Sequence, residues 1–227
     1  MYQHRFSSPQ ESQWPGAAGY NGQPLTLPQV TSAVTLFADI VGYTEHCEFL
    51  GPEEAYLLLS DFYRHTSHAT TMHSAAMVDH FGDELLAVWK GPAPIEVQAF
   101  RALRCAFTIL SELECWNEWR RQSHLPPVKV GIGIHAGPVM LGRALAGHGG
   151  GTSVFGDTVN IASRLERQTR RFGTDIIISD ELFRLIDGMA GDTAILDHFP
   201  KTVSVNLTGR AKPLDVRPAV TFHTSGK

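Results

Sequence analysis

Residues 77–89 read Met-Val-Asp-His-Phe-Gly-Asp-Glu-Leu-Leu-Ala-Val-Trp, and this stretch decides the fold. Two short runs of mostly apolar residues, 77–81 and 85–89, flank a Gly-Asp pair. Such a pair between two runs of this kind is typical of a tight hairpin turn. The stretch therefore predicts two antiparallel strands that are joined at Gly82 and Asp83.

A strand and a helix are predicted before the hairpin. The apolar run 34–38 is typical of a buried strand, and it ends at Asp39. Residues 51–54, Gly-Pro-Glu-Glu, predict a helix start, because Pro is favoured in the first turn and acids interact well with the positive end of the helix dipole. Helical spacing of apolar side chains follows at Ala55, Leu58, Leu59, Phe62 and Ala69.

A similar order follows the hairpin. Apolar residues at helical spacing predict a second long helix, and 128–135 alternates like a strand. Residues 158–170 predict a further helix, and 176–178 an apolar strand. The order predicts an α+β fold with a ferredoxin-like β-α-β-β-α-β core and additions. The apolar positions of the second long helix are Ala99, Leu103, Ala106, Leu110 and Leu113.

Composition favours one folded domain with flexible ends. We expect a flexible arm at 1–30, a catalytic domain at 31–221 and a short tail at 222–227. The chain has 227 residues, is 43% hydrophobic and carries a net charge of −4 without a basic block, so nucleic-acid binding is not indicated. No run approaches the roughly 18 apolar residues of a membrane span.

Cysteine usage and the N-terminus indicate a cytoplasmic protein. The three cysteines, Cys47, Cys105 and Cys115, show no paired spacing, which fits buried thiols in a reducing compartment. The start of the chain is polar rather than apolar, so we expect no signal peptide.

Three motifs in order carry a family resemblance. They are Phe-Ala-Asp-Ile-Val-Gly-Tyr-Thr at 37–44, Phe-Gly-Asp-Glu-Leu-Leu-Ala-Val at 81–88, and Val-Phe-Gly-Asp-Thr-Val-Asn-Ile-Ala-Ser-Arg-Leu-Glu at 154–166. Together they closely resemble the catalytic core of the class III nucleotidyl cyclases. The resemblance implies conversion of a nucleoside triphosphate into a 3′,5′-cyclic monophosphate and pyrophosphate.

This chemistry calls for two divalent metal ions, and the first two motifs offer their ligands. One ion lowers the pKa of the attacking ribose hydroxyl and the other neutralises the leaving oxygens. Mg²⁺ or Mn²⁺ prefers carboxylate oxygens. Asp39 and Asp83 fit this role, and the family adds the carbonyl of Ile40. Taken alone, Asp39 could be a loop cap and Asp83 a turn residue, and Glu84 is interpreted as a solvated strand residue.

Asn160 and Arg164 are the predicted catalytic side chains. They lie four residues apart and so share one helix face. The resemblance implies that Asn160 orients the ribose and that Arg164 stabilises charge on the α-phosphate, both acting in the site of a partner chain. A homodimer would then hold two shared sites. The alternative is a surface Asn and an Arg paired with Glu166 or Asp157.

The base pocket departs from the adenylate cyclase pattern. Adenylate cyclases usually carry Lys where this chain has Asp79, and Asp or Thr where it has Ser153. An ionised carboxylate only accepts hydrogen bonds, so Asp79 suits a ring N–H, and Ser153 could donate to an adjacent carbonyl. Guanine and uracil both present that pair. Guanylate cyclases use an acid, normally Glu, at the first position.

A further departure favours a pyrimidine. Phe81 stands where the family usually has an Ile that packs on the base, and a larger side chain beside a shorter acid favours a smaller base. The short architecture resembles bacterial pyrimidine cyclases of anti-phage signalling. We therefore favour UTP and cUMP in antiviral signalling over GTP and cGMP, with CTP and ATP as further alternatives. Asp79 could also point away from the pocket.

The sequence does not decide which residues bind the triphosphate. The family often has Lys before the Gly of a late motif, but this chain has Thr208 there. Arg143, Arg210 and Lys212 are candidates to replace it, or they are solvated cations. Thr208 mildly favours a rival reading, a degenerate cyclase domain that binds nucleotide without turnover, whereas the retained motifs argue against it.

Overall fold

The computed structural model describes residues 29–143, 152–191 and 193–220. The expected tail and residues 1–28 of the expected arm lie outside this part. In chain order the elements are β1 (Gln29–Ile40), α1 (Tyr43–Phe49), α2 (Pro52–Met72), β2 (Met77–Phe81), β3 (Glu84–Trp89), α3 (Ile95–Gln122), β4 (Val130–Arg143), β5 (Thr152–Phe155), α4 (Asp157–Phe172), β6 (Ile176–Ser179), α5 (Asp180–Asp187), the 3₁₀ helix η2 (Ala194–His198), β7 (Val203–Val205) and β8 (Leu214–Pro218).

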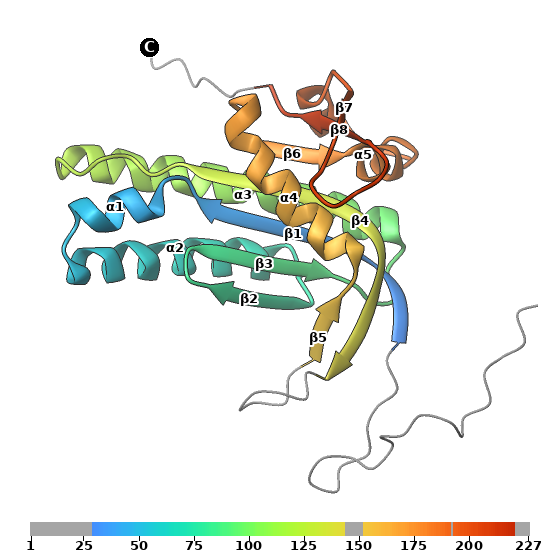
Figure 1. The fold of residues 1–227 in the computed structure, drawn as a ribbon, viewed down its shortest axis with the longest axis horizontal. Coiled ribbons are helices and arrows are strands. Elements are labelled where there is room, and N and C mark those ends of the chain that lie inside the picture. The colour runs from blue at the N-terminus through green and yellow to red at the C-terminus, as the bar shows by residue number, and fades with distance from the viewer. Residues whose placement is uncertain (1–28, 144–151, 192, 221–227) are drawn as a thin grey trace, which may run out of the picture.

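One sheet organises the described residues (Figure 1). Its strand order is β2-β3-β1-β4-β6-β8-β7, and β5 pairs with β4. The strands β2, β3, β1 and β4 are antiparallel neighbours. Because α2 connects β1 to β2 and α3 connects β3 to β4, these elements form the predicted β-α-β-β-α-β core. The α+β, ferredoxin-like expectation is therefore confirmed, and β5 to β8 are additions to it.

The hairpin forms where the sequence predicts it. Phe81 pairs with Glu84 across the turn. Gly82 has a φ of 62°, in the left-handed region that glycine enters without steric cost. The hydroxyl of Tyr63, on α2, donates a hydrogen bond of 2.5 Å to the carbonyl of Gly82. Helix α2 therefore holds the turn that carries Asp83.

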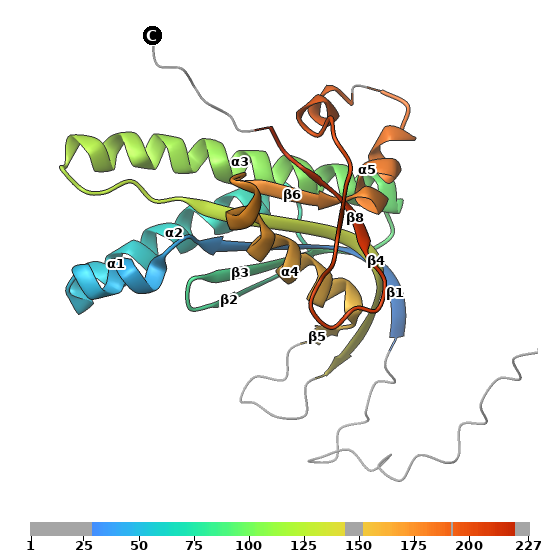
Figure 2. The same cartoon turned by 45° about the horizontal axis from the view of Figure 1, so that its top comes forward.

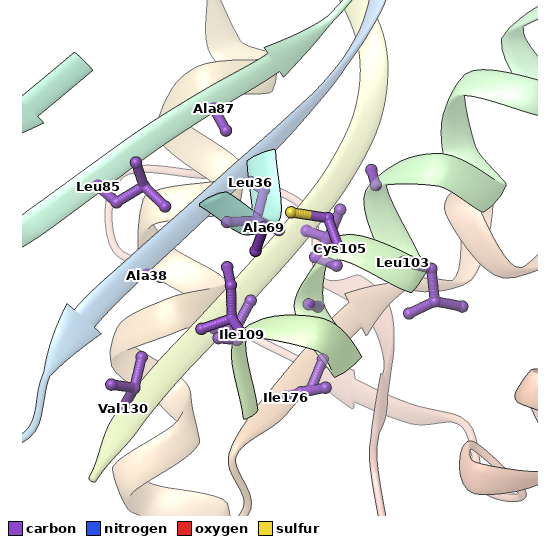
Figure 3. Close-up of a cluster of buried hydrophobic side chains, with 14 of the residues drawn as sticks. Leu36, Ala38, Ala69, Leu85, Ala87, Leu103, Cys105, Ile109, Val130 and Ile176 are labelled. Atoms are coloured by element: carbon purple, nitrogen blue, oxygen red, sulfur yellow. The ribbon is translucent and has the colours of Figure 1, made fainter. Parts of the chain in front are cut away.

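The main core lies between the sheet and the helices α2 and α3. Alternate residues of β1, among them Leu36 and Ala38, meet Cys105 and Ile109 of α3 (Figure 3). Burial raises the pKa of the Cys105 thiol to about 12, so this cysteine is packed and unreactive. The expectation of buried thiols is right for Cys105 but wrong for Cys115, which is exposed on α3.

Helix α4 covers the opposite face of the sheet, and two glycines let it approach β4 closely. A Cβ atom at Gly133 would lie 2.9 Å from the Cα of Glu166 and closer still to the carbonyl oxygen of Ala162. A Cβ atom at Gly131 would lie 2.7 Å from a carboxylate oxygen of Glu166. The missing side chains therefore fix how deep α4 sits on the sheet.

Strand β4 is longer than the predicted 128–135. It continues to Arg143, pairs with the start of β1 and with β5, and curves away from the sheet with β5 (Figure 2). Gly137 and Pro138 are usual strand breakers, which is why alternation ends there in the sequence. Backbone pairing on both sides nevertheless carries the strand through. Among the described residues, no helix combines the length and the apolar character that crossing a membrane requires.

Candidate active site

Asp39 and Asp83 come together at one end of the sheet. Asp39 is the second-last residue of β1, and it pairs with Glu84 at the start of β3. The backbone N–H of Ile40 donates to the carbonyl of Asp83 at 3.4 Å. Adjacent strands therefore bring the two aspartates side by side, although they are far apart in the sequence. This is the juxtaposition that a shared metal site requires.

Burial and like charge govern the ionisation of Asp39. Burial raises its pKa to about 6, and the nearby charge of Asp83 acts in the same direction. Arg170 opposes both by donating to Asp39 Oδ2 at 2.6 Å. The two aspartates thus form a partly buried acidic pair, with the Arg170 guanidinium on one side.

Arg170 also binds a buried acid of its own helix. Its Nη1 donates to Glu166 Oε1 at 2.7 Å, and the Glu166 side chain is only 1% exposed. Burial raises the pKa of Glu166 to about 7, against the attraction of Arg170. Sequence reasoning paired Glu166 with Arg164 as an alternative, and the structure pairs it with Arg170 instead. Nothing in the sequence marks Arg170 as a neighbour of Asp39.

Glu84 is not a solvated strand residue as expected. It is half-buried beneath α4, and its Oε1 accepts a hydrogen bond from Ser163 at 3.4 Å. The expectation failed because it treated the residue after the turn as facing water. Since Glu84 pairs with Asp39, it adds a further carboxylate to this end of the sheet.

Asn160 and Arg164 lie on the first half of α4, away from the aspartates of the same chain. A rise of 1.5 Å per residue places Asn160 roughly 15 Å along the helix axis from Arg170. Asn160 is exposed, and the guanidinium of Arg164 lies beside Gly209. Arg210, not Arg164, binds Asp157, at 2.8 Å. The chain therefore presents two separate groups of predicted site residues.

The predicted base-binding residues lie on two different strands. His80 of β2 contacts Thr66 of α2. Because side chains alternate along a strand, Asp79 and Phe81 face the opposite side, the one that α4 covers. Asp79 is exposed and Phe81 is 60% exposed. Ser153 lies on β5, where it pairs with Gly142.

Two of the three candidate triphosphate residues can be placed with their side chains. Arg210 is partly buried by its ion pair with Asp157, whereas Lys212 is exposed. Arg143 ends β4, and its side chain lies outside the described part of the structure. Arg210 is therefore already engaged by a carboxylate at the start of α4.

Comparison with known proteins assigns the chain to a family. A family model, the adenylate and guanylate cyclase catalytic domain, matches residues 26–210. The chain belongs to this family. The resemblance to the class III nucleotidyl cyclases is thereby confirmed, and the two groups of predicted site residues lie in a cyclase fold.

Similar proteins include cyclases with different bases in their names. Adenylate cyclase 1 of Rhizobium meliloti (strain 1021) is 32% identical over 160 residues, which is 70% of this chain and 24% of that protein. The guanylate cyclase soluble subunit beta-2 of Rattus norvegicus is 30% identical over 146 residues, which is 64% of this chain and 21% of that protein. The chain thus spans about a quarter of the length of these relatives.

A solved structure shows the same fold. The guanylyl cyclase Cya2 superposes with a TM-score of 0.73 at 24% identity, covering 87% of this chain and 95% of that one. At this level of identity the likeness concerns the backbone. It confirms that the sheet and helices described above are those of a cyclase catalytic domain.

Proposed function

We propose that this cyclase domain converts a nucleoside triphosphate into a 3′,5′-cyclic monophosphate and pyrophosphate. The observation that carries the proposal is the juxtaposition of Asp39 and Asp83 at the end of β1 and the turn of the β2–β3 hairpin. A structural pair of acids would be expected to separate, because like charges at close range destabilise each other. Family membership supports the same reading.

The aspartate pair fits a divalent cation. Both acids are hard oxygen donors, and a cation would relieve the repulsion that helps to raise the pKa of Asp39. Within residues 29–143, 152–191 and 193–220, no group of three or more acidic, His or Cys side chains forms a closed metal cage. Asp39, Asp83 and the carbonyl of Ile40 would therefore hold Mg²⁺ or Mn²⁺ together with phosphate oxygens and water.

The chain's own residues then have distinct tasks. When bound, the metal ions supply charge neutralisation at the phosphates and acidify the ribose hydroxyl. Asp39 and Asp83 would hold these ions, Asn160 would orient the ribose, and Arg164 would stabilise the negative charge that builds up at the α-phosphorus. Arg210, Lys212 or Arg143 would bind the outer phosphates.

The site is complete only in a homodimer. Asn160 lies roughly 15 Å along α4 from Arg170, the residue that contacts Asp39, and the Arg164 guanidinium is directed to Gly209, so a second copy would supply both side chains to the Asp39 site. Large apolar side chains near the start of α4 support a partner surface, since Met140 is 44% and Phe155 49% exposed. Two copies related by a two-fold axis would form two equal sites.

Complementation tests the shared site. Asp39→Ala and Arg164→Ala should each abolish turnover, while a mixture of the two variants should regain about a quarter of the wild-type rate, because half of the dimers carry one intact site. The Arg171→Gln variant, which changes an exposed neighbour on α4, is the control. No recovery in the mixture, with dimers verified by sedimentation, would contradict a shared site.

We propose that the site recognises a base that presents a ring N–H next to a carbonyl, and we favour uracil over guanine. Support comes from the exposed carboxylate of Asp79 and the exposed ring of Phe81 on the same face of β2. The names of the relatives include adenylate and guanylate cyclases, so guanine is the second candidate. The role in antiviral signalling stays a prediction from the sequence.

The base is tested by product analysis. Purified protein with Mn²⁺ is given ATP, GTP, CTP or UTP separately, and cyclic products are measured by mass spectrometry. We expect cUMP, and cGMP would move the assignment to guanine. The Asp79→Asn variant should reduce the preference for UTP over the other nucleotides, because an amide both donates and accepts hydrogen bonds. Mainly cAMP from the wild type would refute the proposed role of Asp79, and no product would favour a non-catalytic binding module.

A further inference from the structure

Arg170 bridges a predicted metal ligand and a buried acid. One guanidinium nitrogen donates to Asp39 Oδ2 at 2.6 Å, and the other donates to Glu166 Oε1 at 2.7 Å. The Arg170 side chain is 37% exposed, that of Asp39 20% and that of Glu166 1%. The bridge therefore has a buried end at Glu166 and a half-open end at Asp39.

The surrounding backbone seats this bridge. Gly131 is the register partner of Asp39 on β4, and a side chain there would collide with Glu166 and Thr169. Thr169 in turn donates its hydroxyl to the carbonyl of Glu166 at 2.6 Å. Arg170 lies in the last turn of α4, where a cation also interacts favourably with the helix dipole. Its position is therefore set by packing and does not depend on the ion pair alone.

We propose that Arg170 is a positioning residue for the metal site, and this inference rests on the proposed function. A carboxylate has two oxygens, and Arg170 engages Oδ2 of Asp39, which leaves Oδ1 available to a cation. Outer partners that hold a ligating carboxylate in this way typically change metal affinity by about ten- to a hundred-fold when they are lost.

Charge balance supports the same assignment. Three carboxylates, those of Asp39, Asp83 and Glu84, gather at this end of the sheet, and Glu166 lies behind them. Arg170 is the cation for which ion pairs to this group are observed among the described residues. It keeps Asp39 in place before a metal ion arrives, so the site is preorganised and little rearrangement is needed on binding.

A purely structural brace between α4 and β1 is the competing explanation. Such a brace would affect stability and turnover but would leave the intrinsic affinity for metal unchanged in folded protein. In a third explanation Arg170 competes with the metal ion for Asp39, and its removal would then strengthen metal binding. The direction of the change in metal affinity separates the three readings.

The test measures Mn²⁺ binding to the folded, nucleotide-free protein by electron paramagnetic resonance. Arg170→Gln should weaken Mn²⁺ binding about ten- to a hundred-fold, Arg170→Lys should restore part of it, and Arg171→Gln should match the wild type. In turnover assays the Mn²⁺ concentration for half-maximal rate should rise by the same factor, with a smaller change in kcat. Unchanged or tighter Mn²⁺ binding by Arg170→Gln would overturn the proposal.

A double variant guards against misfolding. Arg170→Gln leaves Glu166 as a buried acid without its cation, which can unfold the domain. Glu166→Gln combined with Arg170→Gln removes that problem, and it should still bind Mn²⁺ as weakly as the single variant. Wild-type affinity in the folded double variant would refute the role of Arg170. If Asp39→Ala binds Mn²⁺ as well as the wild type, the metal site itself is wrong, which separates failure of the proposed function from failure of this inference.

Discussion

Replacing Gly133 by Ala should push α4 away from the sheet and destabilise the domain. The added methyl group would lie 2.9 Å from the Cα of Glu166, and closer to the backbone of Ala162 and the amide of Glu166, whereas ordinary contact begins at 3.4 Å. These neighbours are backbone atoms, so no side-chain rotation relieves the clash. The Cα of Glu166 must retreat by about half an ångström and its neighbours by more, which overpacking studies equate with a loss of about 1–3 kcal/mol.

The same shift should impair catalysis, because α4 carries Asn160 and Arg164. Misplacing catalytic groups by about 1 Å can lower turnover about a hundred-fold. The assay combines urea unfolding with cyclic nucleotide production by the folded variant. Gly142→Ala is the matched control on the same strand, since its methyl group would contact only the Phe155 ring at 3.9 Å. If Gly133→Ala is as stable and as active as Gly142→Ala, the close approach of α4 to β4 is refuted.

Three further predictions concern single side chains. Burial raises the pKa of Glu166 from 4.5 to about 7, so the folded chain binds a proton that the unfolded chain releases. Stability should therefore fall as pH rises between these values, and Glu166→Gln should flatten that slope in pH-dependent urea unfolding. Tyr63→Phe removes the hydrogen bond to the Gly82 carbonyl and should cost about 0.5–1.5 kcal/mol by the same method, while an unchanged value would contradict that bond. Ser179→Ala removes both the N-cap of α5 and the hydrogen bond to the buried His135 ring, so the free energy of unfolding should fall by at least about 1 kcal/mol; a melting temperature equal to that of the wild type would contradict both contacts.

The sequence predicts those parts of the fold that depend on neighbours in the chain. The hairpin at Gly82 and Asp83 and the helix start at Pro52 are local patterns, and both appear as predicted. The β-α-β-β-α-β core follows from the order of the predicted strands and helices along the chain. Asp39 and Asp83 could be singled out because each belongs to a short motif at the end of a strand.

The contacts that the sequence could not predict join distant segments. Arg170 meets Asp39 across 131 residues, and nothing in its helical spacing distinguishes it from Arg171. The sequence predicts a solvated Glu84 because strand alternation indicates which face a residue takes but not what covers that face. The extension of β4 past Pro138 depends on pairing with β1 and β5, which local breaker rules do not see.

The geometry of the proposed site depends as much on absent side chains as on reactive ones. Most of the stability of a helix in a protein comes from packing rather than from intrinsic propensity, so the position of α4, with 16 residues, depends mainly on the sheet beneath it. That packing is set by Gly131 and Gly133, which let the backbone of α4 approach β4 and give Glu166 room. The first half of α4 then carries Asn160 outward, while its last turn reaches back to the aspartates. A substitution in β4 that never touches substrate can therefore disturb both groups of site residues at once.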